Sequence, residues 1–248
     1  MKSLFELTKV EFKLTLRNFP VAFFSLVFPV LMVLMFGGIY GNKPDPSVGG
    51  HSTVDIMVPS LVGAVIAVTG LMSLPLTIAG YRERKILKRF MATPISPYYV
   101  IVSQVTVNFA TTLIGLLLLA IVGKLVFDLH YLAQGPAFIL AFLLSIFSIF
   151  SFGFLIASVA PNAHAATAIA NLVYFPMLFL TGATIPLEVM PKIMVKISKI
   201  LPLTYAVDLL KNTWLGSDTS YLLDILVLAV VLIVSLVISL FTFKWEYE

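Results

Sequence analysis

The sequence alternates long apolar segments with short polar ones, and six apolar segments are long enough to cross a bilayer. A transmembrane helix needs about 20 mainly apolar residues. The six segments cover residues 20–40, 55–80, 97–122, 135–160, 163–181 and 221–243. Pro161-Asn162 interrupts an uncharged stretch that is too long for one span, so a tight turn is expected there. The pattern predicts an all-α membrane protein with six transmembrane helices in a single domain, residues 1–248.

A charged amphipathic segment precedes the first span, over residues 1–18. One charged stripe recurs at steps of three and four through Lys2, Glu6, Lys9, Lys13 and Arg17, and Glu11 intrudes on the apolar remainder of the helix. Such a helix lies in the membrane interface with its basic side toward the headgroups. The pattern fits equally a helix that only anchors the chain to the membrane surface and a helix that contacts a partner protein. The contact residues in either case are Lys9, Lys13 and Arg17.

The densest cluster of cations lies between the second and third spans, in residues 81–97, which we call the hinge. It contains Arg82, Arg84, Lys85, Lys88 and Arg89. Ile86, Leu87, Phe90 and Met91 fall on the other side of a short helix, which Thr93-Pro94 ends. The apolar side favours either docking into a groove of a partner or lying on the headgroups.

A second irregular region precedes the last span, over residues 182–212. Pro186, Pro191 and Pro202 divide it into pieces too short to span a bilayer. Isoleucines and lysines alternate at helical spacing between residues 192 and 200. We expect short amphipathic helices that re-enter the outer face of the membrane and shape the mouth of any pathway.

Lysine and arginine in the short loops predict the orientation. The N-terminal segment, the hinge and the C-terminal tail carry most of them, whereas the loops after the first and third spans carry only Lys43 and Lys124. Four lysines between the fifth and sixth spans disagree with this assignment. The distribution of lysine and arginine over all the loops therefore predicts a multi-pass protein of the cell membrane with both termini in the cytoplasm.

Composition supports a lipid environment. The 248 residues are 60% hydrophobic and 11% charged, with a mean hydropathy of +1.04, whereas soluble domains have about 25% charged residues. The net charge of +4 comes from loops beside apolar segments, so nucleic acid is not an expected partner. The sequence has no cysteine, which excludes disulfides, thiol catalysis and cysteine-ligated metals.

Candidate chemistry inside the spans is sparse. No charged residue lies near the middle of a proposed span, which disfavours a proton- or sodium-coupled carrier. No phosphate-binding loop of the GxxxxGK[ST] type occurs, so the chain is expected neither to bind ATP by that route nor to be an enzyme. Polar stripes in the spans are explained by interhelical hydrogen bonds or by a pathway. The candidate pathway residues are Gln104, Asn108, Asn171 and Tyr174.

Two stretches resemble the membrane subunit of ABC transporters of the ABC-2 (type V exporter) permease family, especially its drug-resistance and antibiotic-export branch. In the hinge the similar residues are Glu83, Arg84, Leu87, Arg89, Ala92, Thr93, Pro94 and Ser96. Before the last span they are Pro176, Gly182, Pro186, Pro191, Pro202, Tyr205 and Asp208. The hinge departs from a common family variant, since Tyr81 stands where a glutamate is often found and Lys85-Ile86 replaces Gly-Thr.

The resemblance implies an export permease for a hydrophobic or amphipathic substrate such as a drug, antibiotic, peptide or lipid-like molecule. Two permeases, identical or related, would assemble with two copies of a separately encoded ATPase that binds ATP and magnesium. The hinge would be the coupling helix in a cleft of the ATPase, through Glu83, Arg84, Leu87, Lys88, Arg89, Phe90, Thr93 and Pro94. The turn with Pro161, Asn162 and His164 would be a second, smaller contact. A membrane scaffold or sensor that binds a partner through the same hinge is the alternative.

Overall fold

The structure, a computed structural model, describes residues 2–41, 50–91, 98–129, 135–185, 187, 190–216 and 220–244. All elements in these residues are helices of α or, where marked η, π type: α1 (Lys2–Arg17), α2 (Phe19–Ala22), η1 (Phe23–Val27), α3 (Phe28–Tyr40), α4 (Thr53–Ala67), η3 (Val68–Ser73), α5 (Leu74–Glu83), α6 (Ile86–Met91), α7 (Tyr98–Phe127), α8 (Gly135–Val159), α9 (Ala163–Leu180), α10 (Lys192–Ser198), α11 (Pro202–Leu215) and α12 (Leu222–Thr242).

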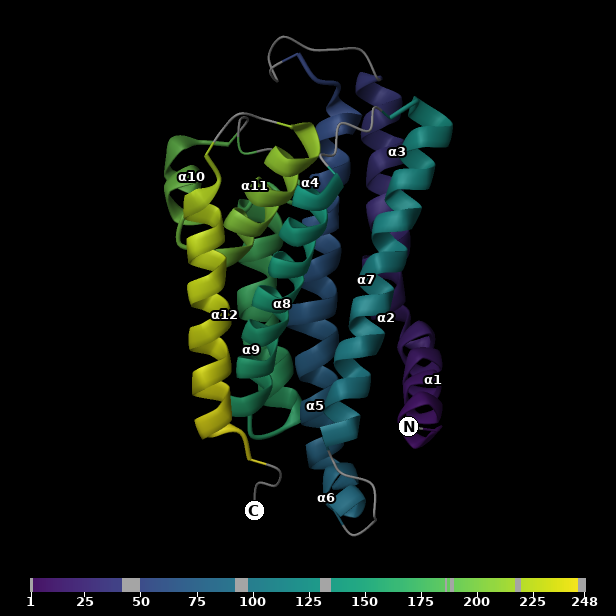
Figure 1. Cartoon of the computed structure of the whole chain (residues 1–248), viewed down its shortest axis with the longest axis vertical. Helices are drawn as coiled ribbons and strands as arrows, with labels where there is room; N and C mark the ends of the chain where they lie inside the picture. The colour runs from purple at the N-terminus through teal and green to yellow at the C-terminus, as the bar shows by residue number, and fades with distance from the viewer. Residues whose placement is uncertain are drawn as a thin grey trace.

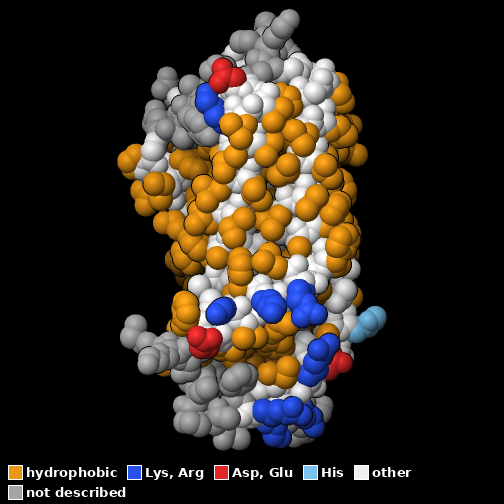
Figure 2. Space-filling view, turned by 90° about the vertical axis from the view of Figure 1, so that its right-hand side faces the viewer, with side chains coloured by type: hydrophobic (Ala, Val, Ile, Leu, Met, Phe, Trp, Pro, Cys, Tyr) orange, Lys and Arg blue, Asp and Glu red, His pale blue; other side chains and the backbone are white. Residues whose placement is uncertain are grey.

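Six continuous helical segments of the described chain are long and apolar enough to cross a membrane, and they confirm the six predicted spans. They are Phe19–Tyr40, Thr53–Glu83, Tyr98–Phe127, Gly135–Val159, Ala163–Leu180 and Leu222–Thr242. The helix α1, the short helix α6 and the end of α12 lie at one end of the bundle, and α10 and α11 lie toward the other (Figure 1). A broad hydrophobic band covers the middle, and lysine and arginine side chains gather toward the α1 and α6 end (Figure 2).

The second span is the centre of the fold. Of the residues in its most apolar 18-residue stretch, 83% are buried within the chain, whereas only 17% are buried in the corresponding stretch of the last span. The helix α4 packs against α3, α7 and α11, and α5 packs against α8 and α9. A capping box begins α4, in which the Ser52 and Asp55 side chains each accept the other residue's backbone N–H. The hinge is therefore attached to the most enclosed helix of the described bundle.

A π-helical section, η3, lies midway along this span, followed by Pro75. It brings the backbone of Gly70 against Gly153 of α8. A Cβ atom added to Gly153 would overlap the carbonyl oxygen of Gly70. Glycine at position 153 therefore allows the two helix backbones to approach more closely than a side chain would permit.

The region before the last span differs in part from the expectation of short surface helices. The helix α10 is short and exposes Ile193 and Ile197, as the isoleucine–lysine alternation predicted. The helix α11, by contrast, has 14 residues and packs against α4, α8 and α12. Its apolar residues recur at helical spacing and form a buried stripe, which includes Leu203, Ala206, Val207 and Leu210.

Candidate functional site

Three consecutive residues at the foot of the central span, Tyr81, Arg82 and Glu83, each bind a different part of the molecule. They form the last turn of α5, directly before the hinge helix α6. Successive residues of an α-helix point about 100° apart, so three in a row can reach three different neighbours. We call Tyr81-Arg82-Glu83 the anchor.

Tyr81 connects the anchor to α1. Its hydroxyl donates a 2.6 Å hydrogen bond to Oε2 of Glu11, and Nε2 of Gln104 donates a second 2.6 Å bond to the same oxygen. One carboxylate thereby joins α1, α5 and α7. Glu11 is only 5% exposed, and this burial raises the pKa of its carboxyl group above the usual value, although both hydrogen bonds act to lower it.

Arg82 connects the anchor to the end of α8. Its Nη1 donates 2.9 Å hydrogen bonds to the carbonyl oxygens of Ala157 and Ala160, which lie at the helix terminus where backbone acceptors need partners. The guanidinium carbon lies 4.9 Å from the centroid of the Phe243 ring, within the range of a cation–π contact. Arg82 is 4% exposed. The sequence-based count of hinge cations placed it with the loop charges, but its side chain lies inside the fold because these acceptors are there.

Glu83 connects the anchor to the start of α9. Its Oε2 accepts a 2.8 Å hydrogen bond from the backbone N–H of Ala163, and Oδ1 of Asn162 accepts one of 2.8 Å from Ala165. Both acceptors satisfy N–H groups that the first turn of a helix leaves without partners. The hinge and the turn at Pro161, which the sequence suggested as two separate partner contacts, are therefore joined by a direct hydrogen bond.

The hinge helix α6 presents cations to the surface and turns one leucine inward. Lys85 has a positive φ of 55° and separates α5 from α6. Arg84, Lys88 and Arg89 are exposed, whereas Leu87 is 1% exposed and its side chain is covered by the chain itself. The Phe90 side chain and the predicted stop at Thr93-Pro94 lie outside the described residues.

The other predicted contact residues lie on the surface at the same end of the bundle. Lys9, Lys13 and Arg17 are exposed along α1, and Pro161, Asn162 and His164 are exposed at the turn between α8 and α9.

The candidate pathway residues separate into two groups. Gln104 and Asn108 are buried in the packing of α7: Gln104 holds Glu11, and Asn108 Nδ2 donates to the Gln104 carbonyl at 2.8 Å. Tyr174 is buried and Asn171 is half-buried, both on α9. Tyr174 contributes to a cavity between the first, second and fifth spans, described further below. Gln104 thus joins α7 to α1 by an interhelical hydrogen bond, whereas the Asn108 bond lies within α7.

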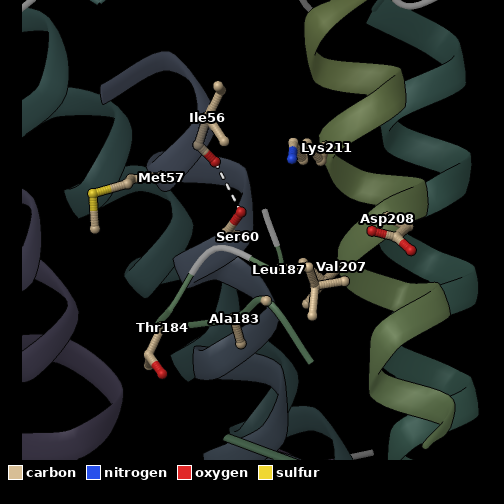
Figure 3. A pocket seen from close by; sticks show the side chains of 10 residues that line it. Ile56, Met57, Ser60, Ala183, Thr184, Leu187, Val207, Asp208 and Lys211 are labelled. Carbon is tan, nitrogen blue, oxygen red and sulfur yellow. Dashed lines mark hydrogen bonds between the residues drawn. The ribbon is translucent and has the colours of Figure 1, made fainter. Parts of the chain in front are cut away.

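At the opposite end, the predicted outer residues Gly182 and Asp208 line a small pocket between α4 and α11, together with Ile56 and Ser60 (Figure 3). Its volume of about 30 Å³ is enough to hold water but not a larger molecule. Gly182 has φ of +82°, which favours glycine. Tyr205 donates a 2.7 Å hydrogen bond to the carbonyl of Lys199, which ties α11 to the end of α10.

The other prolines in this region begin helices: Pro191 immediately precedes α10, and Pro202 opens α11. Pro186 lies outside the described residues.

Sequence reasoning missed the anchor, although two signals pointed to it. Glu11 is the one acidic residue on the apolar side of the N-terminal helix, and a carboxylate in that position requires donors from another element. Tyr81 departs from the family pattern and supplies one of them. The pairing of Arg82 and Glu83 with the two sides of the Pro161 turn depends on tertiary packing, for which the sequence contains no separate signal.

Comparison with known proteins gives one family. The family model described as "ABC-2 type transporter" matches residues 2–215. "Probable multidrug ABC transporter permease YbhS" of Escherichia coli (strain K12) is 24% identical over 175 residues, which are 69% of this chain and 46% of YbhS. The chain thus matches about half the length of that relative.

Two further relatives are similar. Nodulation protein J of Rhizobium leguminosarum bv. viciae is 33% identical over 90 residues, 36% of this chain and 35% of that protein. "Putative transport permease ycf38" of Porphyra purpurea is 23% identical over 203 residues, 79% of this chain and 68% of that protein. With six apolar helices and a family match over most of its length, the chain is a multi-pass membrane protein that belongs to the ABC-2 type transporter family.

Proposed function

We propose that the chain is the membrane-spanning permease subunit of an ATP-driven ABC exporter. The observation that carries this proposal is the anchor. An exposed cationic helix is joined by one helical turn to the most enclosed span, and that turn also binds α1, α8 and α9. A force applied to α6 is therefore delivered to the core of the bundle and not absorbed by a loose loop.

The partner in this proposal is a separately encoded ATPase in two copies, each of which binds ATP and magnesium. Arg84, Lys88 and Arg89 supply the exposed charge of the contact, with the Pro161 turn beside them. Both lie at the end of the bundle where α1 begins and α12 ends, which this proposal places in the cytoplasm (Figure 1). Because Leu87 is covered by the chain, its role in the contact is to hold α6 in place.

A second permease, identical or related, completes the proposed transporter, and the substrate passes between the two. The narrow outer pocket at Gly182 and Asp208 lies inside one chain and is too small for a drug-sized molecule, which favours a route between the two permeases. The substrate we propose is hydrophobic or amphipathic, as in the drug and antibiotic branch of the family. The name of YbhS, a multidrug permease, supports that branch.

The test is co-expression and co-purification with the ATPase encoded nearest to this chain, followed by reconstitution into vesicles. Arg84→Ala combined with Arg89→Ala is expected to reduce stimulation of ATP hydrolysis while leaving membrane insertion and melting temperature unchanged. These positions are preferable to Glu83, since replacing Glu83 also removes the cap of α9. Unchanged stimulation in the double variant contradicts the proposed contact. An ATPase that binds but never drives substrate movement would instead identify a scaffold.

A further inference from the structure

A polar cavity of about 280 Å³ lies between the N-terminal helix and the central span, at the level of the anchor. The buried side of the cavity includes Glu11, Thr15 and Ser73, each at most 9% exposed, and its exposed rim includes Asn18 and Arg84. Lipid headgroups would lie at this depth, because α1 ends at Arg17 and the first span begins at Phe19. The cavity is therefore placed where a membrane lipid could insert its headgroup between two helices.

The polar groups around this cavity have unused hydrogen-bonding capacity. Both hydrogen bonds that Glu11 accepts in the described chain end on Oε2, which leaves Oε1 for the cavity. The side chains of Thr15, Asn18, Ser73 and Thr77 make no hydrogen bond within the described residues. By contrast, Thr69, Thr111 and Thr112 all bond a backbone carbonyl of the preceding turn. These polar groups line the cavity, and a polar ligand that enters it can supply the hydrogen bonds that they lack.

An apolar cavity of about 190 Å³ continues from the polar one toward the middle of the membrane. The two share Asn18 and Leu76 in their walls. Beyond these residues the lining is Val21 and Phe24 of the first span, Met72 of the second and Phe175 of the fifth. A groove that is polar at headgroup depth and apolar below it matches a molecule with a polar head and a hydrocarbon tail.

The charges on the two sides of the polar cavity determine which class of lipid headgroup it favours. Glu11 provides a buried negative charge and Arg84 an exposed positive one, so a zwitterion is favoured over an anion or a cation alone. A primary ammonium can donate hydrogen bonds to Glu11 and to the hydroxyl oxygens, whereas a quaternary ammonium has no N–H and is bound by several aromatic rings. Among the described residues that line the polar cavity, Tyr81 is the only aromatic one. We propose that this groove binds a phospholipid with a primary-amine headgroup, its ammonium beside Glu11 and its phosphate beside Arg84.

This proposal does not depend on transport, and its test uses no ATP. The full chain is purified, reconstituted into nanodiscs of equal parts phosphatidylethanolamine, phosphatidylcholine and phosphatidylglycerol, and released gently for native mass spectrometry. Phosphatidylethanolamine is expected to be retained roughly tenfold over the other two, as for one charge-assisted hydrogen bond. Glu11→Gln is expected to abolish that preference, and Arg84→Gln to weaken retention of phosphatidylethanolamine by removing the partner of its phosphate.

Two further variants separate binding from folding. Thr77→Val changes a cavity hydroxyl that makes no hydrogen bond in the described chain, so it is expected to lower retention without lowering the melting temperature. Asp128 forms an exposed ion pair with Lys124 at the far end of α7, with 2.6 Å between Oδ1 and Nζ. Asp128→Asn breaks this pair away from the cavity and is expected to change neither lipid retention nor the melting temperature.

Equal retention of the three lipids by the wild type overturns the proposal, as does full retention in a stably folded Glu11→Gln variant. So does a long-chain alkylamine without phosphate that displaces the lipid and binds equally well in Arg84→Gln. That last result would assign the groove to a cationic cargo.

Discussion

Arg82 and Glu83, neighbours in the chain, hold opposite sides of the same turn between α8 and α9. The guanidinium of Arg82 donates to the carbonyls of Ala157 and Ala160 at the end of α8, and the carboxylate of Glu83 accepts from Ala163 at the start of α9. A displacement of α5 must therefore either carry this turn with it or break three hydrogen bonds. The hinge and the turn behave as one mechanical unit at this end of the bundle.

Loss of the Glu83 carboxylate should loosen the turn without unfolding the protein. Glu83→Ala removes an acceptor and a negative charge from the first turn of α9, an interaction worth about 0.3–1 kcal/mol at a helix N-terminus. Because the sequence has no cysteine, a spin label on a cysteine introduced in place of His164 would report only this site. We expect a more mobile label in Glu83→Ala and a smaller change in Glu83→Gln, which keeps an acceptor oxygen. Identical spectra in the three proteins would contradict the cap.

Loss of Arg82 should destabilise the whole bundle. Arg82→Met removes two charged donors from buried carbonyls, and hydrogen bonds to charged groups contribute about 1.5–3 kcal/mol each. Arg82→Lys keeps the charge but replaces the planar guanidinium, which also lies over the Phe243 ring, with a compact ammonium, so an intermediate loss is expected. The measurement is the melting temperature of the protein in detergent, with Arg89→Gln, an exposed arginine of the hinge helix, as the control. An Arg82→Met variant as stable as this control would show that the contacts to α8 are dispensable.

The six spans could be predicted from the sequence because each depends on local composition. Every predicted span boundary lies within five residues of the observed one. The Pro161-Asn162 turn was predictable for the same reason, since proline and asparagine act on their immediate neighbours. The burial of α11 was not, because pieces bounded by prolines suggested surface helices, and the contact of α11 with α4 joins segments far apart in the chain.

The candidate site was predictable only as a charged segment. The position and positive charge of the hinge follow from the sequence, as do the exposed Arg84 and Arg89. The different partners of Tyr81, Arg82 and Glu83 do not follow from the sequence, because each side chain binds a residue 70 to 80 positions away. Charge counting treats Arg82 as a loop cation, and only the packing of α5 against α8 shows that it is internal.

Close packing at Gly153 predicts a selective effect of one methyl group. Gly153→Ala places a Cβ onto the carbonyl oxygen of Gly70, and the backbones of η3 and α8 must separate, at a cost of about 1–3 kcal/mol or more. Gly38→Ala is the matched control, since no described atom beyond its chain neighbours and its own helix backbone lies within 4 Å of a Cβ added there. We expect a lower yield of folded, monodisperse protein and a lower melting temperature for Gly153→Ala alone. Equal behaviour of the two variants would contradict the close approach.

Docking of α1 should respond to pH through Glu11. In contact with water the carboxyl has a pKa of about 4.3, and burial raises it in the docked helix. The docked state therefore binds the proton more tightly, so docking strengthens as pH falls through the interval between the two pKa values and weakens as pH rises through it. Spin labels on cysteines introduced in place of Glu6 and Val102, both exposed, would measure the distance between α1 and α7.

The distance distribution is expected to narrow on acidification in the wild type and to stay constant in Glu11→Gln, which has no proton to gain. The amide oxygen of the introduced glutamine can still accept hydrogen bonds from Tyr81 and Gln104, so the variant should keep α1 docked at all pH values tested. A pH response of the same size in Glu11→Gln would assign the effect to another group.

The last prediction separates the structural from the contacting residues of the hinge helix. Leu87 is 1% exposed, so Leu87→Ala should reduce stability by roughly 2–3 kcal/mol, as for other buried leucines. Arg89 is exposed, so Arg89→Ala should leave the melting temperature unchanged and instead weaken stimulation of the ATPase. Measuring both quantities in both variants gives opposite patterns if α6 is a coupling helix with one covered face. If Arg89→Ala leaves stimulation intact while Leu87→Ala abolishes it without loss of stability, the partner must reach the opposite face of α6, and the helix has to turn before it binds.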